Sequence, residues 1–413
     1  MSGTKKYSLL WREIGLEGII FCLGIFLKQF YLFPSGSLGA GDLCFGLCAL
    51  MLLGKGLLKQ RRLEVQKKDW PVYCFFVCVV IINGIYFLQL GHRDYIRYSV
   101  YWLYSIMIIW SFRQIGINEF IRFMIAKVLK VSILIQMMVF VIGHGRIYYE
   151  YWGGTRFMGT FNNPNQMAYI VFLMLLILYF YEPDKKKFWF YGILAGWLIG
   201  ATKSTGVFLG WGSLAFFDGI SLLYKLSRNN AVYRKAWRAG GLALLLGIPL
   251  ILWIIWPEAG FRIEETDYSL VARIQEKIYK VWTGGITGLI YDRGWERMIL
   301  YPQYLLYGGG EGNYEIRFPM TIWQSEIHST FFSIWFCYGI IPLGLICRWL
   351  YGILKGSFVQ YWPVYGALFL ECMTVINYRQ PFFWIVLLAG PLLVSKEKRA
   401  GDSNLIKGRL KNE

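Results

Sequence analysis

The chain has 413 residues, of which 56% are hydrophobic and 19% aromatic, and its formal net charge is +18. Its mean hydropathy of +0.42 is too high for a soluble globular domain, so the composition indicates a membrane protein. The basic residues form short clusters between apolar stretches, as the positive-inside rule requires of cytoplasmic loops, and we therefore expect no nucleic-acid partner.

Apolar windows of about 20 residues, the length that crosses a bilayer, recur from end to end. The sequence therefore predicts an all-α polytopic membrane protein with about twelve transmembrane helices. We expect these near residues 13–33, 37–54, 70–90, 95–112, 119–142, 164–182, 188–201, 204–224, 239–256, 328–348, 357–376 and 381–395. The first apolar run carries Glu13, Glu17 and Lys28 without a small-residue cleavage site, so we interpret it as a permanent helix and not a signal peptide.

Lys and Arg concentrate in alternate connections, which predicts an even number of spans and two cytoplasmic termini. The basic clusters lie at residues 5–12, 55–68, 185–187, 225–238 and 396–411. By elimination, the extracytoplasmic connections are 34–36, 91–94, 143–163, 202–203, 257–327 and 377–380. The chain is thus divided into helices 1–9 (1–256), an extracytoplasmic loop domain (257–327), and helices 10–12 with a basic tail (328–413).

Metal and cofactor chemistry find little support in the sequence. The eight cysteines fall inside apolar windows without metal-ligand spacing, so we expect packing roles for them and no zinc. The outer loops contain no Asp-x-Asp pair, so the sequence requires no divalent metal, and we expect no cofactor. Asp42 and Glu371 lie within spans, where a charge is costly, and we expect both to pair inside the bundle.

Residues 156–165 open the sixth span with a dense run of Asn, Gly and Pro. Asn165 can cap the following helix, whose N-terminus attracts anions, and Arg156 adds a fork-shaped cation that suits phosphate. We take Arg156, Asn163 and Asn165 as candidate substrate-binding residues; the alternative is a capped helix entry with an interfacial arginine. Lys203, in the turn between spans seven and eight, is a further candidate, although a snorkelling lysine also explains it.

The loop domain carries several arginines, and two of them are four residues apart. A helix would present Arg293 and Arg297 on one face, toward an anion. The alternative is pairing with Asp292 and Glu296 on a solvated helix. The glycine run at 308–312 lets the backbone come close to a ligand or to another segment, and it is not a nucleotide-binding P-loop.

His328 lies where the polar loop domain meets an apolar run, at the expected membrane surface. Glu326 is two residues away and arginines precede it, so the imidazole could accept a proton from an attacking hydroxyl. A structural histidine is the alternative. His92 and His144 lack such neighbours, and we expect them at the interface.

Five stretches of the chain resemble the O-antigen ligase-like superfamily, which includes Wzy-type polymerases and WaaL-type ligases. In order, these stretches are residues 156–165, 202–206, 293–295, 307–314 and 327–344. The resemblance implies the GT-C type of glycosyltransferase architecture, with its active site outside the bacterial plasma membrane. It also implies that His328 is the base on the acceptor hydroxyl and that Arg293 binds the diphosphate of the donor.

The chain departs from the family at one place, because the family often has a Ser-Arg pair where this sequence has Ser204-Thr205. Either Lys203 supplies that charge, or Arg156 and Arg379 do. Arg379 lies in a polar outer corner between the last two spans, and we include it with Glu326 among the candidate substrate-binding residues.

The resulting hypothesis is a polymerase of O-antigen, capsule or exopolysaccharide repeat units. It would transfer the growing glycan from undecaprenyl diphosphate to a sugar hydroxyl of the incoming unit, with inversion and without metal. The alternatives are an O-antigen ligase with another acceptor, and a lipid-linked glycan transporter. The expected partners are the undecaprenyl-diphosphate-linked oligosaccharide, membrane lipid, a chain-length regulator and a flippase.

Overall fold

The computed structural model describes residues 15–31, 39–60, 63, 65–116, 118–229, 250, 253–320 and 326–409. Within these ranges the protein is mostly helical, with a single two-stranded sheet. Five of the described helices are long and apolar enough to cross a membrane. They are α3 (Ala40–Leu57), α4 (Trp70–Leu90) with the 3-10 turn η1 (Lys67–Asp69), α6 (Glu119–Ile142), α7 (Pro164–Tyr181) and α9 (Thr205–Asn229). The protein is therefore helical and membrane-embedded.

The other helices of the bundle are shorter or less apolar. They are α2 (Leu16–Leu27), α5 (Asp94–Ile115), α8 (Lys185–Ala201), α15 (Thr330–Tyr338), α16 (Ile340–Leu354), α17 (Phe358–Cys372) and α18 (Pro381–Arg409). The predicted span at 239–256 and the basic cluster at 5–12 lie largely or wholly outside the described residues, as does part of the cluster at 225–238. The number of twelve spans therefore stays a prediction.

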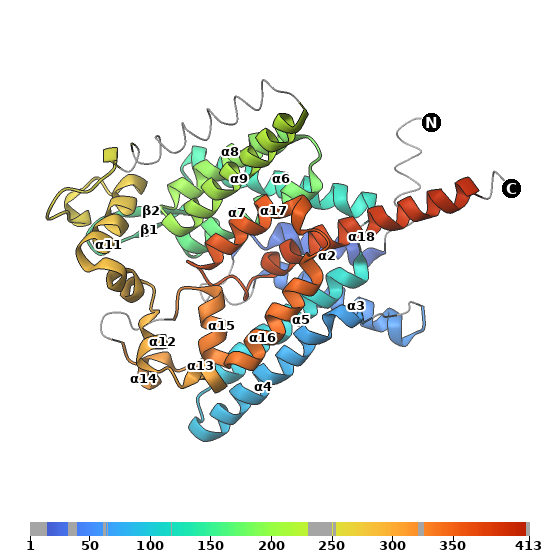
Figure 1. Cartoon of the computed structure of the whole chain (residues 1–413), viewed down its shortest axis with the longest axis horizontal. Helices are drawn as coiled ribbons and strands as arrows, with labels where there is room; N and C mark the ends of the chain where they lie inside the picture. The colour runs from blue at the N-terminus through green and yellow to red at the C-terminus, as the bar shows by residue number, and fades with distance from the viewer. Residues whose placement is uncertain are drawn as a thin grey trace.

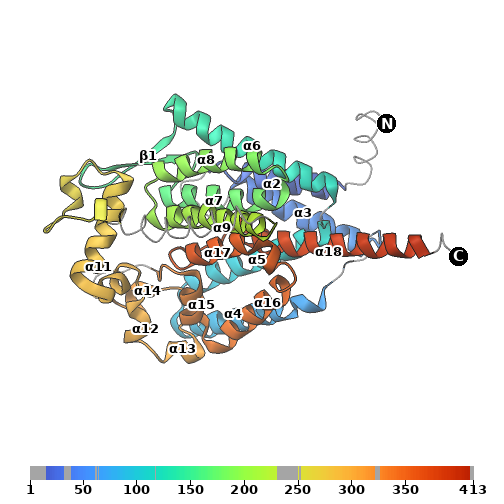
Figure 2. The ribbon, with the colours of Figure 1, turned by 45° about the horizontal axis from the view of Figure 1, so that its top comes forward.

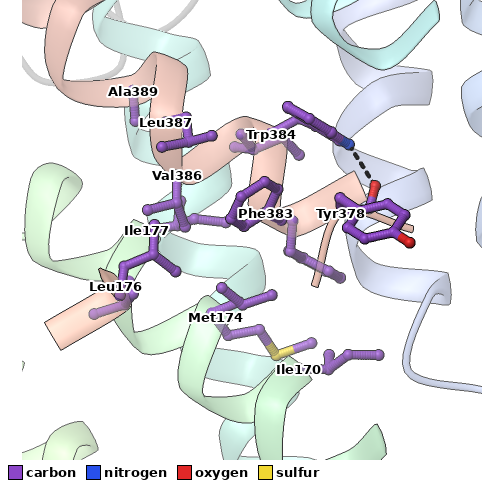
Figure 3. Close-up of a cluster of buried hydrophobic side chains, with 14 of the residues drawn as sticks. Ile170, Met174, Leu176, Ile177, Tyr378, Phe383, Trp384, Val386, Leu387 and Ala389 are labelled. Atoms are coloured by element: carbon purple, nitrogen blue, oxygen red, sulfur yellow. Dashed lines mark hydrogen bonds between the residues drawn. The ribbon is translucent and has the colours of Figure 1, made fainter. Parts of the chain in front are cut away.

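Helix α7 is the centre of the bundle, where it packs against α6, α8, α9, α17 and α18 (Figure 1). Its apolar side chains are buried on all sides, as expected for a helix that other helices surround. Figure 3 shows Ile170, Met174 and other side chains of α7 facing those of α18. At the start of α18, the Nε1 of Trp384 donates a hydrogen bond of 2.8 Å to the carbonyl of Tyr378, which fixes this helix to the connection before it.

A group of short elements, which we call the cap (residues 253–320), covers one end of the bundle. It contains η2 (Ile263–Glu265), α11 (Leu270–Asp292), α12 (Glu296–Leu300), α13 (Tyr304–Tyr307) and α14 (Tyr314–Arg317). Beside α11 lies an antiparallel hairpin of β1 (Arg146–Tyr149) and β2 (Thr155–Gly159). Figures 1 and 2 show these elements at the end of the bundle that is opposite the C-terminal part of α18.

Connections that are far apart in the sequence meet at the cap. A Cβ on Gly312 would lie 2.8 Å from the Cβ of Asp94, the first residue of α5. The hydroxyl of Tyr268 donates to Glu150 of the hairpin at 2.8 Å, and Lys203 lies 4.7 Å from the centre of the same ring. Connections 91–94, 143–163 and 202–203 thus share one face with the described part of 257–327, and we call it the cap face. Connection 34–36 lies outside the described residues, and the orientation of the cap face toward the cell exterior stays a prediction.

The predicted tenth span is wrong as a single helix, because α15 ends and α16 begins at Gly339, whose φ is +81°. The glycine run of the cap packs at this break. The N–H of Gly309 donates to the carbonyl of Phe336 at 2.9 Å, and that of Gly310 donates to the carbonyl of Cys337 at 2.8 Å. The expected close approach of the glycine run to another segment is therefore confirmed, and that segment is the end of α15.

Both acidic residues expected inside the bundle are buried or nearly so, and each has a polar partner. Asp42 forms an ion pair of 2.7 Å with Lys28, which joins α3 to the end of α2, and it also accepts from the hydroxyl of Tyr104. Glu371 accepts from the side-chain amide of Asn377. Asp42 is thus paired with a cation, as expected, whereas the partner of Glu371 is a neutral amide.

Replacing Lys28 by Met should lower the free energy of unfolding by about 3–5 kcal/mol, because it leaves the carboxylate of Asp42 buried without its counter-ion. Chemical denaturation in mixed micelles measures this change. The double variant Lys28→Met/Asp42→Leu removes both charges and should recover much of the loss. Equal stability of the single variant and the wild type would contradict the assigned pair.

Candidate active site

His328 is held beside Arg293 by the backbone. Its N–H donates to the carbonyl of Arg293 at 2.9 Å, and the neighbouring Ile327 is buried. The hydroxyl of Ser329 then caps α15 by accepting from the N–H of Phe332 at 3.4 Å. The imidazole, itself partly exposed, thus lies at the N-terminal end of a bundle helix, next to the cap.

Arg293 follows directly on α11 and does not lie in a helix with Arg297. Gly294 has a φ of +67°, which ends the helix, so the expected common helical face of the two arginines is wrong. The Nη1 of Arg293 donates to the carbonyl of Thr374 at 3.3 Å, and its Nε lies 3.5 Å from Asp292. The side chain is 16% exposed, so it is mostly desolvated yet still reachable.

Asp292 fixes the end of α11 across a kink within the same helix. The kink is at Gly285, where φ is +60°, and beyond it Asp292 accepts from Lys277 at 2.8 Å and from Lys280 at 3.1 Å. Burial raises the pKa of Asp292, but the two ammonium groups more than offset this, so the pKa lies well below its usual range. The ion pairs therefore hold the backbone just before Arg293.

Arg156 lies in β2 and points into the structure, where it is 6% exposed. Its Nε donates to the carbonyl of Thr202 at 2.8 Å, and its Nη2 donates to Asn165 at 2.6 Å. Lys203 is next in the chain to Thr202, has a φ of +54° and donates to the carbonyl of Thr155. The hairpin and the turn between α8 and α9 therefore bring Arg156 and Lys203 together.

The cap of α7 differs from the prediction. Asn163, and not Asn165, is the N-cap residue, because its Oδ1 accepts from the N–H of Asn165 at 2.8 Å and of Gln166 at 3.4 Å. Asn165 instead holds the guanidinium of Arg156. Pro164 occupies the first helical position, where it fits because no hydrogen bond is needed there.

Arg273 of α11 connects the two groups of cations. Its guanidinium lies 5.9 Å from the centre of the Tyr268 ring, the same ring that Lys203 approaches. Burial lowers the pKa of Arg156 and of Arg293, and the charge of Arg273 lowers both further. We call Arg156, Lys203, Arg273 and Arg293 the basic cluster; because its members repel one another, a bound anion would stabilise it.

The imidazole of His328 adjoins this cluster. Burial lowers its pKa below the ordinary 6.5, and the charge of Arg293 lowers it further, while Glu326 and Asp292 act in the opposite direction. The net effect is a lowered pKa, so the ring is mostly neutral at pH 7. A neutral imidazole can accept a proton, as a general base must.

Arg379 and Glu326 are paired with each other. The Nη1 of Arg379 lies 2.8 Å from Glu326, its Nε donates to Glu311 at 3.1 Å, and Glu326 also accepts from the hydroxyl of Tyr98 at 2.6 Å. Burial raises the pKa of Glu326, but Arg379 and Tyr98 outweigh it and keep the group ionised. Both residues are therefore engaged in holding the segment before His328.

Arg297 lies in the interior of the cap. Its side chain is 0% exposed, its Nε donates to the carbonyl of Phe318 at 3.0 Å, and its guanidinium lies 4.9 Å from the centre of the Tyr314 ring. This position gives Arg297 a structural role in the cap, so it is not part of the candidate binding site.

Sequence reasoning gave no role to Arg273, Lys277 and Lys280. Their spacing of three or four residues on one amphipathic helix was the available signal, since such residues share a face. The kink at Gly285, which turns that face toward Asp292, could not be predicted from the sequence. In the described ranges, no three His, Cys, Asp or Glu side chains converge as metal ligands would.

The arrangement can bind a polyanion on four cations and accept a proton beside it. No protein-family model and no curated protein matches the chain, so the site is interpreted from its own residues.

Carbethoxylation of His328 by diethyl pyrocarbonate should be half-maximal at a pH below 6.5, because only the neutral ring reacts and its pKa is lowered. A background with His92→Gln and His144→Gln leaves this histidine alone. In that background Arg293→Gln should move the midpoint upward, since it removes a neighbouring positive charge. Arg262→Gln, an exposed arginine of the cap, is the matched control and should leave the midpoint unchanged. A midpoint above 6.5 would contradict the assigned environment.

Proposed function

We propose that the protein is a glycosyltransferase that polymerises lipid-linked polysaccharide repeat units, with undecaprenyl diphosphate as leaving group. The observation that carries the proposal is the position of His328 beside Arg293 of the basic cluster, on one face of a membrane-embedded helical bundle. The resemblance of these stretches to Wzy-type polymerases supports the same reaction. In the proposed orientation the cap faces outward from a bacterial plasma membrane and both termini are cytoplasmic.

The basic cluster would bind the diphosphate. Arg273 pairs with Glu276 at 3.0 Å and Arg293 donates to Thr374, so each guanidinium would offer phosphate oxygens the N–H groups that these contacts leave over. Lys203 adds a point charge. Arg156 is more deeply buried and already donates to Thr202 and Asn165, so its main contribution would be its charge. These cations would stabilise the negative charge that develops as the diphosphate leaves.

The transfer would be a single inverting displacement. A ring nitrogen of His328 takes the proton of the acceptor hydroxyl, and the oxygen attacks the anomeric carbon of the growing glycan. The new carbon–oxygen bond forms as the bond to the diphosphate breaks, and the electron pair of that bond stays on the diphosphate oxygen. Undecaprenyl diphosphate leaves, and the proton on His328 is later lost to solvent.

The remaining candidate residues would position the reacting groups. Asn163 caps α7 and Asn165 orients Arg156, while Glu326 and Arg379 hold the backbone that carries His328. A direct role of Glu326 in binding the sugar would require it to exchange Arg379 or Tyr98 for a sugar hydroxyl. A chain-length regulator and a flippase are the protein partners that such a polymerase would need.

A WaaL-type ligase is the second candidate, because the same chemistry applies with a different acceptor. A transporter of lipid-linked glycan is a third, and it would need a polar path through the middle of the bundle. The core of α7 is instead apolar on all sides, and the basic cluster gathers at the cap face. This distribution favours a transferase over a transporter.

Purified wild-type protein should convert a lipid-linked repeat unit into a ladder of longer glycans on the lipid. His328→Ala should reduce turnover at least about 100-fold, the usual contribution of a general base. Arg293→Ala should reduce it by a similar factor, because it removes charge stabilisation of the leaving group. Gel analysis of the lipid-linked products measures both.

The matched controls are His92→Ala and Arg262→Ala, which remove the same side chains elsewhere on the cap face and should keep full turnover. Consumption of the donor only when a second acceptor lipid is added would show that the protein is a ligase and not a polymerase. Full turnover of His328→Ala would refute the assigned base, and lipid movement across liposomes without glycan transfer would favour a transporter.

A further inference from the structure

A second charged site lies at the opposite end of the bundle from the cap. A pocket of about 660 Å³ is formed by the first half of α6 and the end of α7. Its polar lining consists of Glu119, Arg122, Lys127, Lys130, Tyr181 and Glu182. Lys130 forms an ion pair with Glu182, whereas Arg122 and Lys127 line the pocket without an ion pair to any residue in the described ranges.

Tyr181 gives an independent indication of a ligand. The residue is 2% exposed and lines the pocket, yet its hydroxyl has no hydrogen-bond partner among the residues that the structure describes. A buried hydroxyl without a partner costs free energy, which a ligand that accepts from it would recover. An anionic oxygen held between this hydroxyl and the two free cations would satisfy all three groups.

The apolar surface next to the pocket indicates what the rest of the ligand is. Beyond Lys127, the same stripe of α6 exposes Val131, Leu134 and Met138, which are 38%, 41% and 55% exposed. At 1.5 Å per residue, the stripe from Lys127 to Met138 is about 16 Å long, which matches the hydrocarbon thickness of one leaflet.

The neighbouring helix α8 adds a second exposed apolar stripe. Phe190, Ile193 and Trp197 are 56%, 64% and 62% exposed at helical spacing, and α8 packs against α6. Figure 2 shows the two helices side by side at one edge of the bundle. A ligand with a charged head in the pocket and two acyl chains along these stripes fits the whole surface.

We propose that this pocket binds the phosphate head group of an anionic phospholipid from the leaflet opposite the cap, which the positive-inside pattern assigns to the cytoplasm. The three cations outnumber the two carboxylates by one, and Lys130 already neutralises Glu182. A head group of net charge −1 therefore complements the site, whereas a zwitterionic head group gains less from it. Glu119 at the mouth opposes anion binding and sets a limit on its strength.

Native mass spectrometry of the delipidated full chain, titrated with phosphatidylglycerol or phosphatidylcholine of identical acyl chains, tests the proposal. The wild type should bind phosphatidylglycerol at least about fivefold more tightly. Arg122→Gln/Lys127→Gln should lose this preference, since each cation near a membrane surface contributes about fivefold. Tyr181→Phe should weaken binding of phosphatidylglycerol, and Glu119→Gln should strengthen it.

The matched control is Arg348→Gln/Lys355→Gln, which removes one exposed cation of α16 and one directly after it, both outside the pocket, and should keep the preference. Equal affinity of the wild type for both lipids would overturn the proposal, as would an unchanged preference in Arg122→Gln/Lys127→Gln. Glycerol 1-phosphate serves as the free head group: binding as tight as that of the lipid would identify a soluble phosphate ester as ligand and exclude the lipid.

Discussion

The carboxylate of Glu311 is the group on which the placement of the cap depends. It is 0% exposed, and it accepts from the indole of Trp102 at 3.0 Å, from the hydroxyl of Tyr378 at 2.7 Å and from Arg379 at 3.1 Å. A buried carboxylate without such donors would cost several kcal/mol, so these contacts are obligatory. They come from α5 and from the connection before α18, which fixes the cap to two parts of the bundle. Arg379 carries the constraint onward to Glu326 and thus to the segment of His328.

The features that depend on local sequence could be predicted. Apolar windows located most of the helices of the bundle, though not the helices of the cap. The distribution of Lys and Arg grouped together the described connections that share the cap face. The break between α8 and α9 also follows from a short polar turn around Lys203. These predictions succeeded because burial in lipid acts on each segment by itself, through hydropathy and length.

The features that depend on tertiary contacts could not be predicted from the sequence. The apolar run after His328 is long enough for one span, and only the glycine run arriving from the cap divides it at Gly339. Both Asn163 and Asn165 can cap a helix, and the choice is made by Arg156, which occupies Asn165. Arg273 gains its importance from the Tyr268 ring, which Lys203 of another connection also approaches, and Lys277 and Lys280 reach Asp292 because α11 has a kink at Gly285. In each case the deciding partner lies elsewhere in the chain.

The pairing of Glu311 with Arg379 also has a consequence for biosynthesis. The two residues are 68 positions apart, and α15, α16 and α17 lie between them in the chain. During synthesis the cap emerges before these helices, so its buried carboxylate has no guanidinium partner until they are inserted. The segment of His328 acquires its own partner at the same moment, through Arg379. Assembly of the site is therefore one of the last steps in making the protein, and a chain truncated before Arg379 would contain most of the candidate site residues without the guanidinium that holds the cap and the segment of His328 in place.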